Sequence, residues 1–197
     1  MGTIIKSSLE KSLSYQEYRN AVAKLAEEGK TSGNEQLEHL INFTKLNEAR
    51  MHRLDKTLTL NEETQLFLEN LKKEYIWIVL AESWCGDAAQ ILPVLNKMAE
   101  ASDKIDFRIV FRDENDDLMN QFLTNGTRSV PKLIILDKNT LEVKADFGPR
   151  PNGAKQLILD YKAAHGSIDE TAKIELQKWY LQDKGISTQK EIVALMK

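Results

Sequence analysis

Residues 75–88 of this chain read Tyr75-Ile76-Trp77-Ile78-Val79-Leu80-Ala81-Glu82-Ser83-Trp84-Cys85-Gly86-Asp87-Ala88. The first seven are β-branched, aromatic or aliphatic without a break, a pattern that predicts a strand buried on both faces. Between residues 88 and 101 the apolar side chains recur at helical spacing, so a helix is expected to follow the strand. A single cysteine therefore stands where a buried strand passes into a helix.

The segments after this unit follow the order expected of an α/β fold. They predict a strand at 105–111, a short helix at 116–123, a hairpin of strands at 132–136 and 141–147, and a helix after residue 151. A strand–helix–strand unit requires parallel neighbours, whereas a closing hairpin adds antiparallel strands. We therefore expect a mixed sheet flanked by helices.

Further helices are predicted on both sides of this block. Their expected capping residues are Ser14, Asn34, Asn61, Ser167 and Thr188. Three of these caps are followed by a glutamate three residues later, the pattern of a capping box. We therefore divide the chain into an N-terminal helical extension (1–61) packed on the core, an α/β domain (62–166) and a C-terminal helical extension (167–197).

Composition and charge exclude several classes of partner. The chain has 197 residues and a net charge of -3, which leaves no basic footprint for nucleic acid or anionic membranes. Its longest apolar run, 76–81, is too short to cross a bilayer, and residues 1–14 lack the apolar stretch of a signal peptide. One cysteine excludes an internal disulfide and suits a reducing compartment. We expect a cytoplasmic protein and leave its oligomeric state open.

Cys85 is the main candidate for chemistry. A thiol in the first turn of a helix faces unpaired N–H groups and the positive end of the helix dipole, which favour an accessible thiolate. Gly86 lets the backbone turn tightly beside the sulfur. Asp87 acts in the opposite direction unless its carboxylate points to solvent. Arg128 and Arg150 could favour an anion if they lie near the thiol, although ordinary solvated surface charge is the competing interpretation.

A second segment, Gly126-Thr127-Arg128-Ser129-Val130-Pro131, stands directly before the hairpin. Together with Trp84-Cys85-Gly86 it resembles the thioredoxin family, whose active-site motif is Trp-Cys-Gly-Pro-Cys and whose cis-proline ends the corresponding loop. The resemblance covers about residues 62–164, and the Cys-Gly-Asp-Ala form is similar to a group of bacterial thioredoxin-like proteins with a single cysteine. It implies that Val130-Pro131 is cis and packs beside Cys85. The Val130 backbone would then bind an extended substrate by strand addition.

The chain departs from the thioredoxin pattern at three positions. Asp87 replaces the proline of the motif, and Ala88 replaces the resolving cysteine. Val79 stands where thioredoxins have the buried acid that assists that second thiol. A dithiol cycle is therefore not available within the chain, and a mixed disulfide at Cys85 would need an external thiol to resolve it.

The leading hypothesis is a thioredoxin-like protein that carries out single-cysteine thiol–disulfide exchange in redox homeostasis. Cys85 would be its catalytic residue, and the expected substrate contacts are Trp84, Gly86, Asp87, Val130 and Pro131. The substrate would be a protein or a low-molecular-weight thiol or disulfide, and an external thiol would act as reductant. Whether Cys85 turns over a substrate is left open.

Two other hypotheses stay beside the leading one. The first is a non-catalytic module that keeps the peptide-docking loop and uses the helical extensions to bind a partner. The second is that the chain binds an iron–sulfur cluster through its single cysteine, as monothiol glutaredoxins do together with glutathione. It ranks lowest, because their Cys-Gly-Phe-Ser motif is missing. We expect no cofactor and no metal, since the three histidines, His39, His52 and His165, have no partners at ligand spacing.

Overall fold

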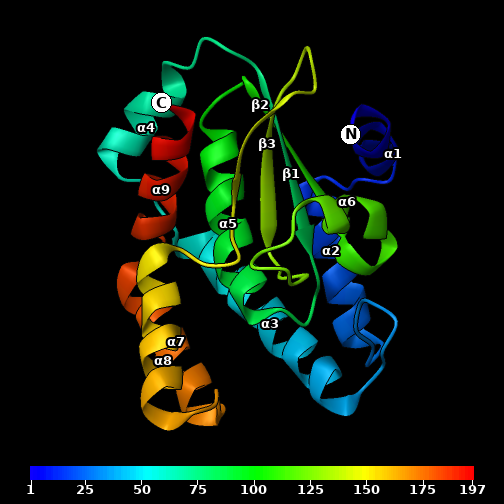
Figure 1. The fold of residues 1–197 in the computed structure, drawn as a ribbon, viewed down its shortest axis with the longest axis vertical. Helices are drawn as coiled ribbons and strands as arrows, with labels where there is room; N and C mark the ends of the chain where they lie inside the picture. Colours follow the sequence, from blue (N-terminus) through cyan, green and yellow to red (C-terminus); the bar gives the residue numbers. More distant parts are fainter.

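The computed structural model describes all 197 residues around one four-stranded sheet (Figure 1). Its strands are β1 (Tyr75–Ala81), β2 (Ile105–Phe111), β3 (Lys132–Asp137) and β4 (Val143–Phe147). They lie in the order β2-β1-β3-β4, with β1 parallel to β2 and antiparallel to β3, and β3 antiparallel to β4. The predicted mixed sheet is therefore confirmed, and the two strands expected at 75–81 and 105–111 have the predicted bounds.

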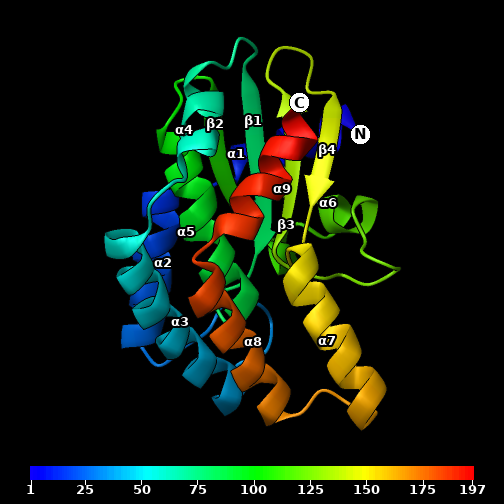
Figure 2. The same ribbon diagram turned by 90° about the vertical axis from the view of Figure 1, so that its left-hand side faces the viewer.

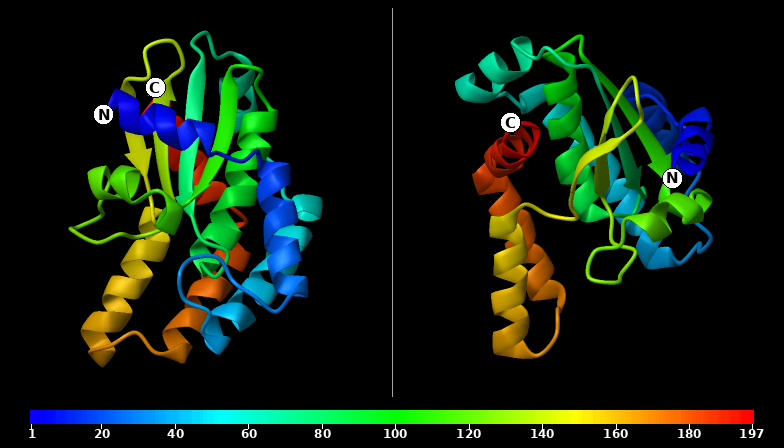
Figure 3. Two further views of the ribbon diagram at one scale, coloured as in Figure 1. Left: turned by 90° about the vertical axis from the view of Figure 1, so that its right-hand side faces the viewer. Right: turned by 45° about the horizontal axis from the view of Figure 1, so that its top comes forward.

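Nine α-helices surround the sheet. They are α1 (Gly2–Glu10), α2 (Tyr15–Glu27), α3 (Glu38–Thr57), α4 (Glu62–Glu69), α5 (Gly86–Glu100), α6 (Asp116–Gln121), α7 (Asn152–His165), α8 (Glu170–Asp183) and α9 (Ile186–Met196). Helices α5 and α9 cover one face of the sheet (Figure 2). Helix α1 crosses the opposite face, where α6 also lies (Figure 3). None of the helices is both long and apolar enough to cross a membrane.

The core lies between β1 and α5. Every residue of β1 is buried, in agreement with its unbroken apolar sequence. Helix α5 is buried around most of its circumference, because α3, α4 and α9 pack against it in addition to the sheet. The residue that starts this helix is consequently held by elements from both ends of the chain.

Two of the predicted caps are confirmed. Ser14 and Glu17 form the reciprocal hydrogen bonds of a capping box at the start of α2. The Asn61 side chain accepts a hydrogen bond from the Thr64 N–H group at 2.9 Å and caps α4. Helix α1 was not predicted, although Ile5 from its apolar face is completely buried.

Three predicted caps are wrong. Helix α3 begins after Leu37 without a side-chain cap, so Asn34 lies in the preceding loop. The cap of α8 is Asp169, which accepts from the Ala172 N–H group, and not Ser167. Helix α9 begins after Gly185, which has a φ of 78°, so Thr188 lies inside the helix. At α9 the left-handed turn at Gly185 precedes the helix, at α8 the cap is a different side chain two residues after Ser167, and α3 starts without any side-chain cap.

A buried polar network attaches the loop before α3 to the end of β1. The Ser83 N–H group donates to Ser32 Oγ at 2.8 Å, and the Ser32 N–H group donates to Ser83 Oγ at 2.9 Å. The Ser32 hydroxyl donates in turn to the fully buried carboxylate of Glu82. Thr44 of α3 completes the network with a hydrogen bond between its hydroxyl and that of Ser83 at 2.9 Å. These bonds fix the loop that leads from β1 to Cys85.

Ser32→Ala should lower the free energy of unfolding by about 2 kcal/mol, because it leaves the Ser83 N–H group and one oxygen of the buried Glu82 carboxylate without a partner, while the other oxygen keeps its hydrogen bond from the Asp113 N–H group. Chemical unfolding in urea, followed by circular dichroism, measures this change. Ser167→Ala is the matched control, because Ser167 is exposed and it should change the stability by less than about 0.5 kcal/mol. Equal stability of the two variants would contradict the structural role of the network.

Candidate functional site

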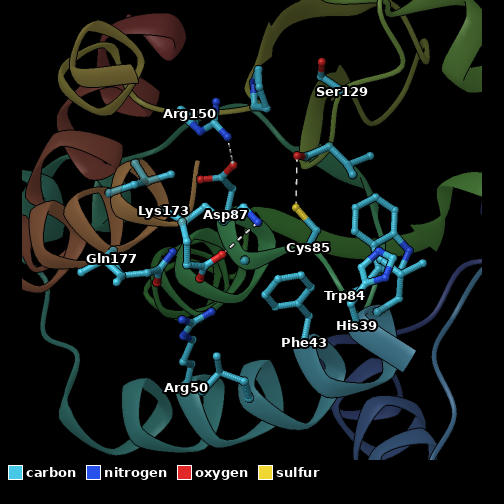
Figure 4. Close-up of a pocket in the computed structure, with 18 of the residues that line it drawn as sticks. His39, Phe43, Arg50, Trp84, Cys85, Asp87, Ser129, Arg150, Lys173 and Gln177 are labelled. Atoms are coloured by element: carbon cyan, nitrogen blue, oxygen red, sulfur yellow. Dashed lines mark hydrogen bonds and ion pairs between the residues drawn. The ribbon is translucent and has the colours of Figure 1, made fainter. Parts of the chain in front are cut away.

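Cys85 lies at the N-cap of α5 and joins the two segments that the sequence singled out (Figure 4). Its thiol donates a hydrogen bond to the carbonyl oxygen of Val130, with a sulfur–oxygen distance of 3.3 Å. The sulfur also accepts from the Ala88 N–H group at 3.5 Å. The peptide bond between Val130 and Pro131 is cis. The loop before β3 and the start of α5 therefore meet at the sulfur.

The sulfur is more covered than the sequence predicted. Only 7% of the Cys85 surface is exposed, whereas its place at a helix start indicated an accessible thiol. Burial raises the pKa of Cys85 to about 12, and the nearby Asp87 carboxylate adds to this effect. The N–H groups at the helix start and the more distant Arg150 lower the pKa without compensating. Cys85 is thus a neutral thiol at physiological pH.

Asp87 is buried beside the sulfur and does not point to solvent. Its carboxylate forms an ion pair with Arg150 Nη2 at 2.7 Å and accepts a hydrogen bond from the Tyr180 hydroxyl at 2.8 Å. Burial raises the pKa of Asp87, while Arg150 and the Tyr180 hydroxyl act in the opposite direction. Tyr180, which comes from α8, was not among the predicted site residues. No local motif could have indicated it, since the contact exists only in the folded chain.

The two arginines considered from the sequence have different roles. Arg150 lies near the thiol and forms a half-buried ion pair with Asp87. Arg128 is exposed, pairs with Asp113 and Asp116, and is not among the groups that shift the pKa of Cys85. The electrostatic role considered for Arg128 stays a prediction, and its ion pairs agree with the competing interpretation of surface charge. A surface ion pair of this kind contributes little to stability.

A cavity of about 790 Å³ opens beside the sulfur. Its size falls within the range of small-molecule sites. Of the residues predicted from the sequence, those that line it are Trp84, Cys85, Gly86, Asp87, Arg128, Val130 and Arg150. Pro131 does not line it, whereas Pro149, which follows a second cis peptide bond, does. No cluster of three histidine, cysteine or carboxylate side chains that could hold a metal ion is present.

Two walls of the cavity come from helices outside the resembling segment. Phe43 and Arg50 extend into it from α3, and Lys173 and Gln177 extend into it from α8 (Figure 4). None of these four side chains was predicted. Both helices have ordinary mixed sequences, so only their packing around α5 reveals that they reach the cysteine.

Of the two polar main-chain groups of Val130, one forms a hydrogen bond within the chain and the other does not. Its carbonyl oxygen accepts the hydrogen bond from the Cys85 thiol. Its N–H group donates no backbone hydrogen bond within the chain. Because Val130 lines the cavity, this donor is positioned to bind a ligand.

Comparison with known proteins identifies the family. The family model described as thioredoxin matches residues 33–166. Two solved structures share the fold, each with a TM-score of 0.57. A protein of unknown function from Pseudomonas aeruginosa is 17% identical, over 93% of this chain and 97% of its own. An HIV epitope-scaffold is 20% identical, over 88% of this chain and 96% of its own.

No curated protein is measurably similar to the chain in sequence. The two solved structures are too distant in sequence to carry more than the fold. The family match covers well over half of the chain and includes both segments that meet at Cys85. It also includes α3, which lies before the part of the sequence that resembles thioredoxin motifs. The chain therefore belongs to the thioredoxin family.

Proposed function

We propose that this protein carries out single-cysteine thiol–disulfide exchange on a ligand bound in the cavity beside Cys85. The observation that supports the proposal is the position of the sulfur, at the start of α5 and at the wall of a cavity large enough for a small molecule. The free N–H group of Val130 supports it further, because a ligand bound there would lie beside the sulfur.

The proposed reaction has two steps. The Cys85 thiol first loses its proton to solvent, and the resulting thiolate attacks one sulfur of a disulfide. An S–S bond to Cys85 forms, the S–S bond of the substrate breaks, and the other half leaves as a thiolate. An external thiol then attacks the mixed disulfide and restores Cys85, because the chain contains no second cysteine. The external thiol attacks the substrate-derived sulfur, so a new S–S bond joins it to the retained half of the substrate and Cys85 leaves as a thiolate. Each cycle thus exchanges one disulfide for another: one half of the substrate is released as a thiol, the external thiol is oxidised, and the protein is unchanged overall.

The raised pKa limits how fast this thiol can react. With a pKa of about 12, roughly one molecule in 100,000 carries the thiolate at pH 7. Only the thiolate is an effective nucleophile. We therefore propose that Cys85 reacts with disulfides bound in the cavity and stays inert toward small oxidants in solution. We call a thiol of this kind, protonated and buried until a ligand binds, a guarded thiol.

The pH dependence of the reaction tests this description. The second-order rate constant for Cys85 with neutral 4,4′-dithiodipyridine should rise about tenfold per pH unit from pH 7 to 9, because the pKa of Cys85 lies at about 12. A free cysteine, with a pKa of about 8.5, should begin to level off within that range. Stopped-flow absorbance measures both rates. A plateau for the protein below pH 8 would contradict a guarded thiol.

Asp87→Asn should increase the rate constant with the same neutral disulfide at pH 7 by about tenfold. The substitution removes the carboxylate that raises the pKa of Cys85, and it leaves the positive charge of Arg150 near the sulfur. Asp103→Asn is the control, because this aspartate is exposed and far from the cavity lining. An unchanged rate in folded Asp87→Asn, with folding verified by circular dichroism, would show that Asp87 does not govern the thiol.

A non-catalytic binding module is the second candidate function. The observation that favours it is the same buried, neutral thiol, which suits a residue that packs against Val130. Under this alternative Cys85→Ser keeps the biological activity of the protein, whereas substitutions at the α3 and α8 walls of the cavity abolish it. Under the exchange mechanism Cys85→Ser is inactive.

A further inference from the structure

The cavity beside Cys85 is far more basic than the chain as a whole. Six arginine and lysine side chains line it against two carboxylates, although the net charge of the chain is -3. Five of the six form an ion pair with a carboxylate, namely Arg112, Arg128, Arg150, Lys173 and Lys178. The sixth, Arg50, forms none and is half-buried. A partly desolvated guanidinium without a counter-ion is a favourable partner for an anion.

Arg50 is held in place by a relay of hydrogen bonds. Its Nη1 atom donates to the Asn47 side-chain oxygen at 2.9 Å. Asn47 is fully buried, and its Nδ2 atom donates to the carbonyl oxygen of Ser83 at 2.9 Å. The guanidinium is therefore fixed relative to the loop that carries Cys85. Such preorganisation lowers the entropy lost when a ligand binds.

A second hydrogen-bond donor, the amide nitrogen of Gln177, lies beside the start of α5 together with Arg50. Gln90 Nε2 donates to the Gln177 side-chain oxygen at 2.8 Å, which leaves the Gln177 amide nitrogen free to donate. The nitrogens Arg50 Nη1 and Gln177 Nε2 both lie 3.5 Å from the position that a Cβ atom on Gly86 would take. Donors from α3 and α8 thus converge one residue from the sulfur (Figure 4).

Apolar side chains from α3 and α8 form another part of the cavity lining. Phe43 and Leu46 of α3 face it, as do Ile174 and Leu181 of α8. Three of these side chains, Leu46, Ile174 and Leu181, are exposed, and exposed apolar side chains grouped around one cavity are typical of a ligand-binding groove. A ligand that matches this lining carries an anionic group beside an apolar body.

We propose that the cavity binds low-molecular-weight thiols and disulfides that carry a carboxylate next to an apolar body. This inference names the substrate class of the proposed function and rests on it. The carboxylate accepts hydrogen bonds from Arg50 and Gln177, and the apolar body packs on Phe43. One sulfur of the bound disulfide faces Cys85 and forms the new S–S bond, and the other leaves as the thiolate of the second half.

The test compares an anionic and a neutral disulfide in a protein that cannot react. Cys85→Ser contains no thiol, so 5,5′-dithiobis(2-nitrobenzoate) can be titrated into it by calorimetry without reaction. Adding Arg50→Gln should weaken this binding about tenfold, the size expected for one lost charge-assisted hydrogen bond. Binding of neutral 4,4′-dithiodipyridine should stay unchanged. Arg50→Lys should keep part of the affinity, because it keeps the charge without the planar guanidinium.

Arg53→Gln is the matched control in the same Cys85→Ser background. It removes one positive charge from the same helix at an exposed position outside the cavity. Equal affinities of the Arg50→Gln and Arg53→Gln variants for the anionic disulfide would overturn the proposal. Gln177→Leu is a second, independent variant and should also weaken the anionic probe while leaving the neutral one unchanged.

Kinetics with wild-type Cys85 separate the two proposals. Reaction with the anionic disulfide that is at least tenfold faster than with the neutral one, and lost in Arg50→Gln, supports both. Binding of the anionic probe to Cys85→Ser without any reaction of the wild-type protein would refute thiol exchange and leave the carboxylate site standing. Reaction with both disulfides at equal rates, without measurable binding to Cys85→Ser, would refute the carboxylate site alone.

Discussion

The Asp87 carboxylate is buried two residues after the only cysteine, and its partners come from distant parts of the chain. Arg150 reaches it from the turn between β4 and α7, and the Tyr180 hydroxyl reaches it from α8. A buried carboxylate is tolerated only when such groups compensate for its lost hydration. The same contacts that stabilise this charge therefore attach the C-terminal helices to the start of α5. They also place a negative charge where it raises the pKa of Cys85.

On the side of the N-terminal helices, hydrogen bonds between uncharged groups hold the loop that carries Cys85. Ser32 and Ser83 exchange hydrogen bonds in the interior, and Asn47 binds the Ser83 carbonyl oxygen from α3. The loop that carries Cys85 is thus held from the N-terminal and the C-terminal helices at once. Helices α3 and α8 end up on either side of α5, and the cavity is the space between their side chains. The contacts of Asp87 on one side and of Ser83 on the other are both buried. The shape of the cavity therefore depends on these buried polar contacts as well as on the sheet.

Because of these contacts, the thiol at the active-site position of the family is buried and has a raised pKa. The sulfur keeps its place at a helix start beside the Val130–Pro131 loop, but it is recessed and protonated. A protonated thiol resists oxidation in solution and reacts slowly with disulfides that do not bind. Selectivity would then come from the cavity, where the unpaired Arg50 and the apolar side chains recognise a ligand before the sulfur meets it. In the proposed exchange, an external thiol would complete the cycle in place of the missing second cysteine.

Local patterns in the sequence determined the sheet strands and most helices, because burial periodicity is encoded by neighbouring residues. The meeting of Cys85 with Val130 was predicted only through the resemblance to thioredoxins, because the two residues lie far apart in the chain. Local patterns placed the starts of α3, α8 and α9 wrongly: α3 has no side-chain cap, Asp169 and not Ser167 caps α8, and a left-handed turn at Gly185 precedes α9. The raised pKa of Cys85 comes first from burial and then from the Asp87 carboxylate, which Arg150 and Tyr180 contact from far along the chain. Arg50 and Gln177 likewise reach the cavity only through the packing of α3 and α8 around α5. Burial and long-range electrostatics arise from the folded arrangement, so the tertiary structure alone decided the character of the thiol and the charge of its cavity.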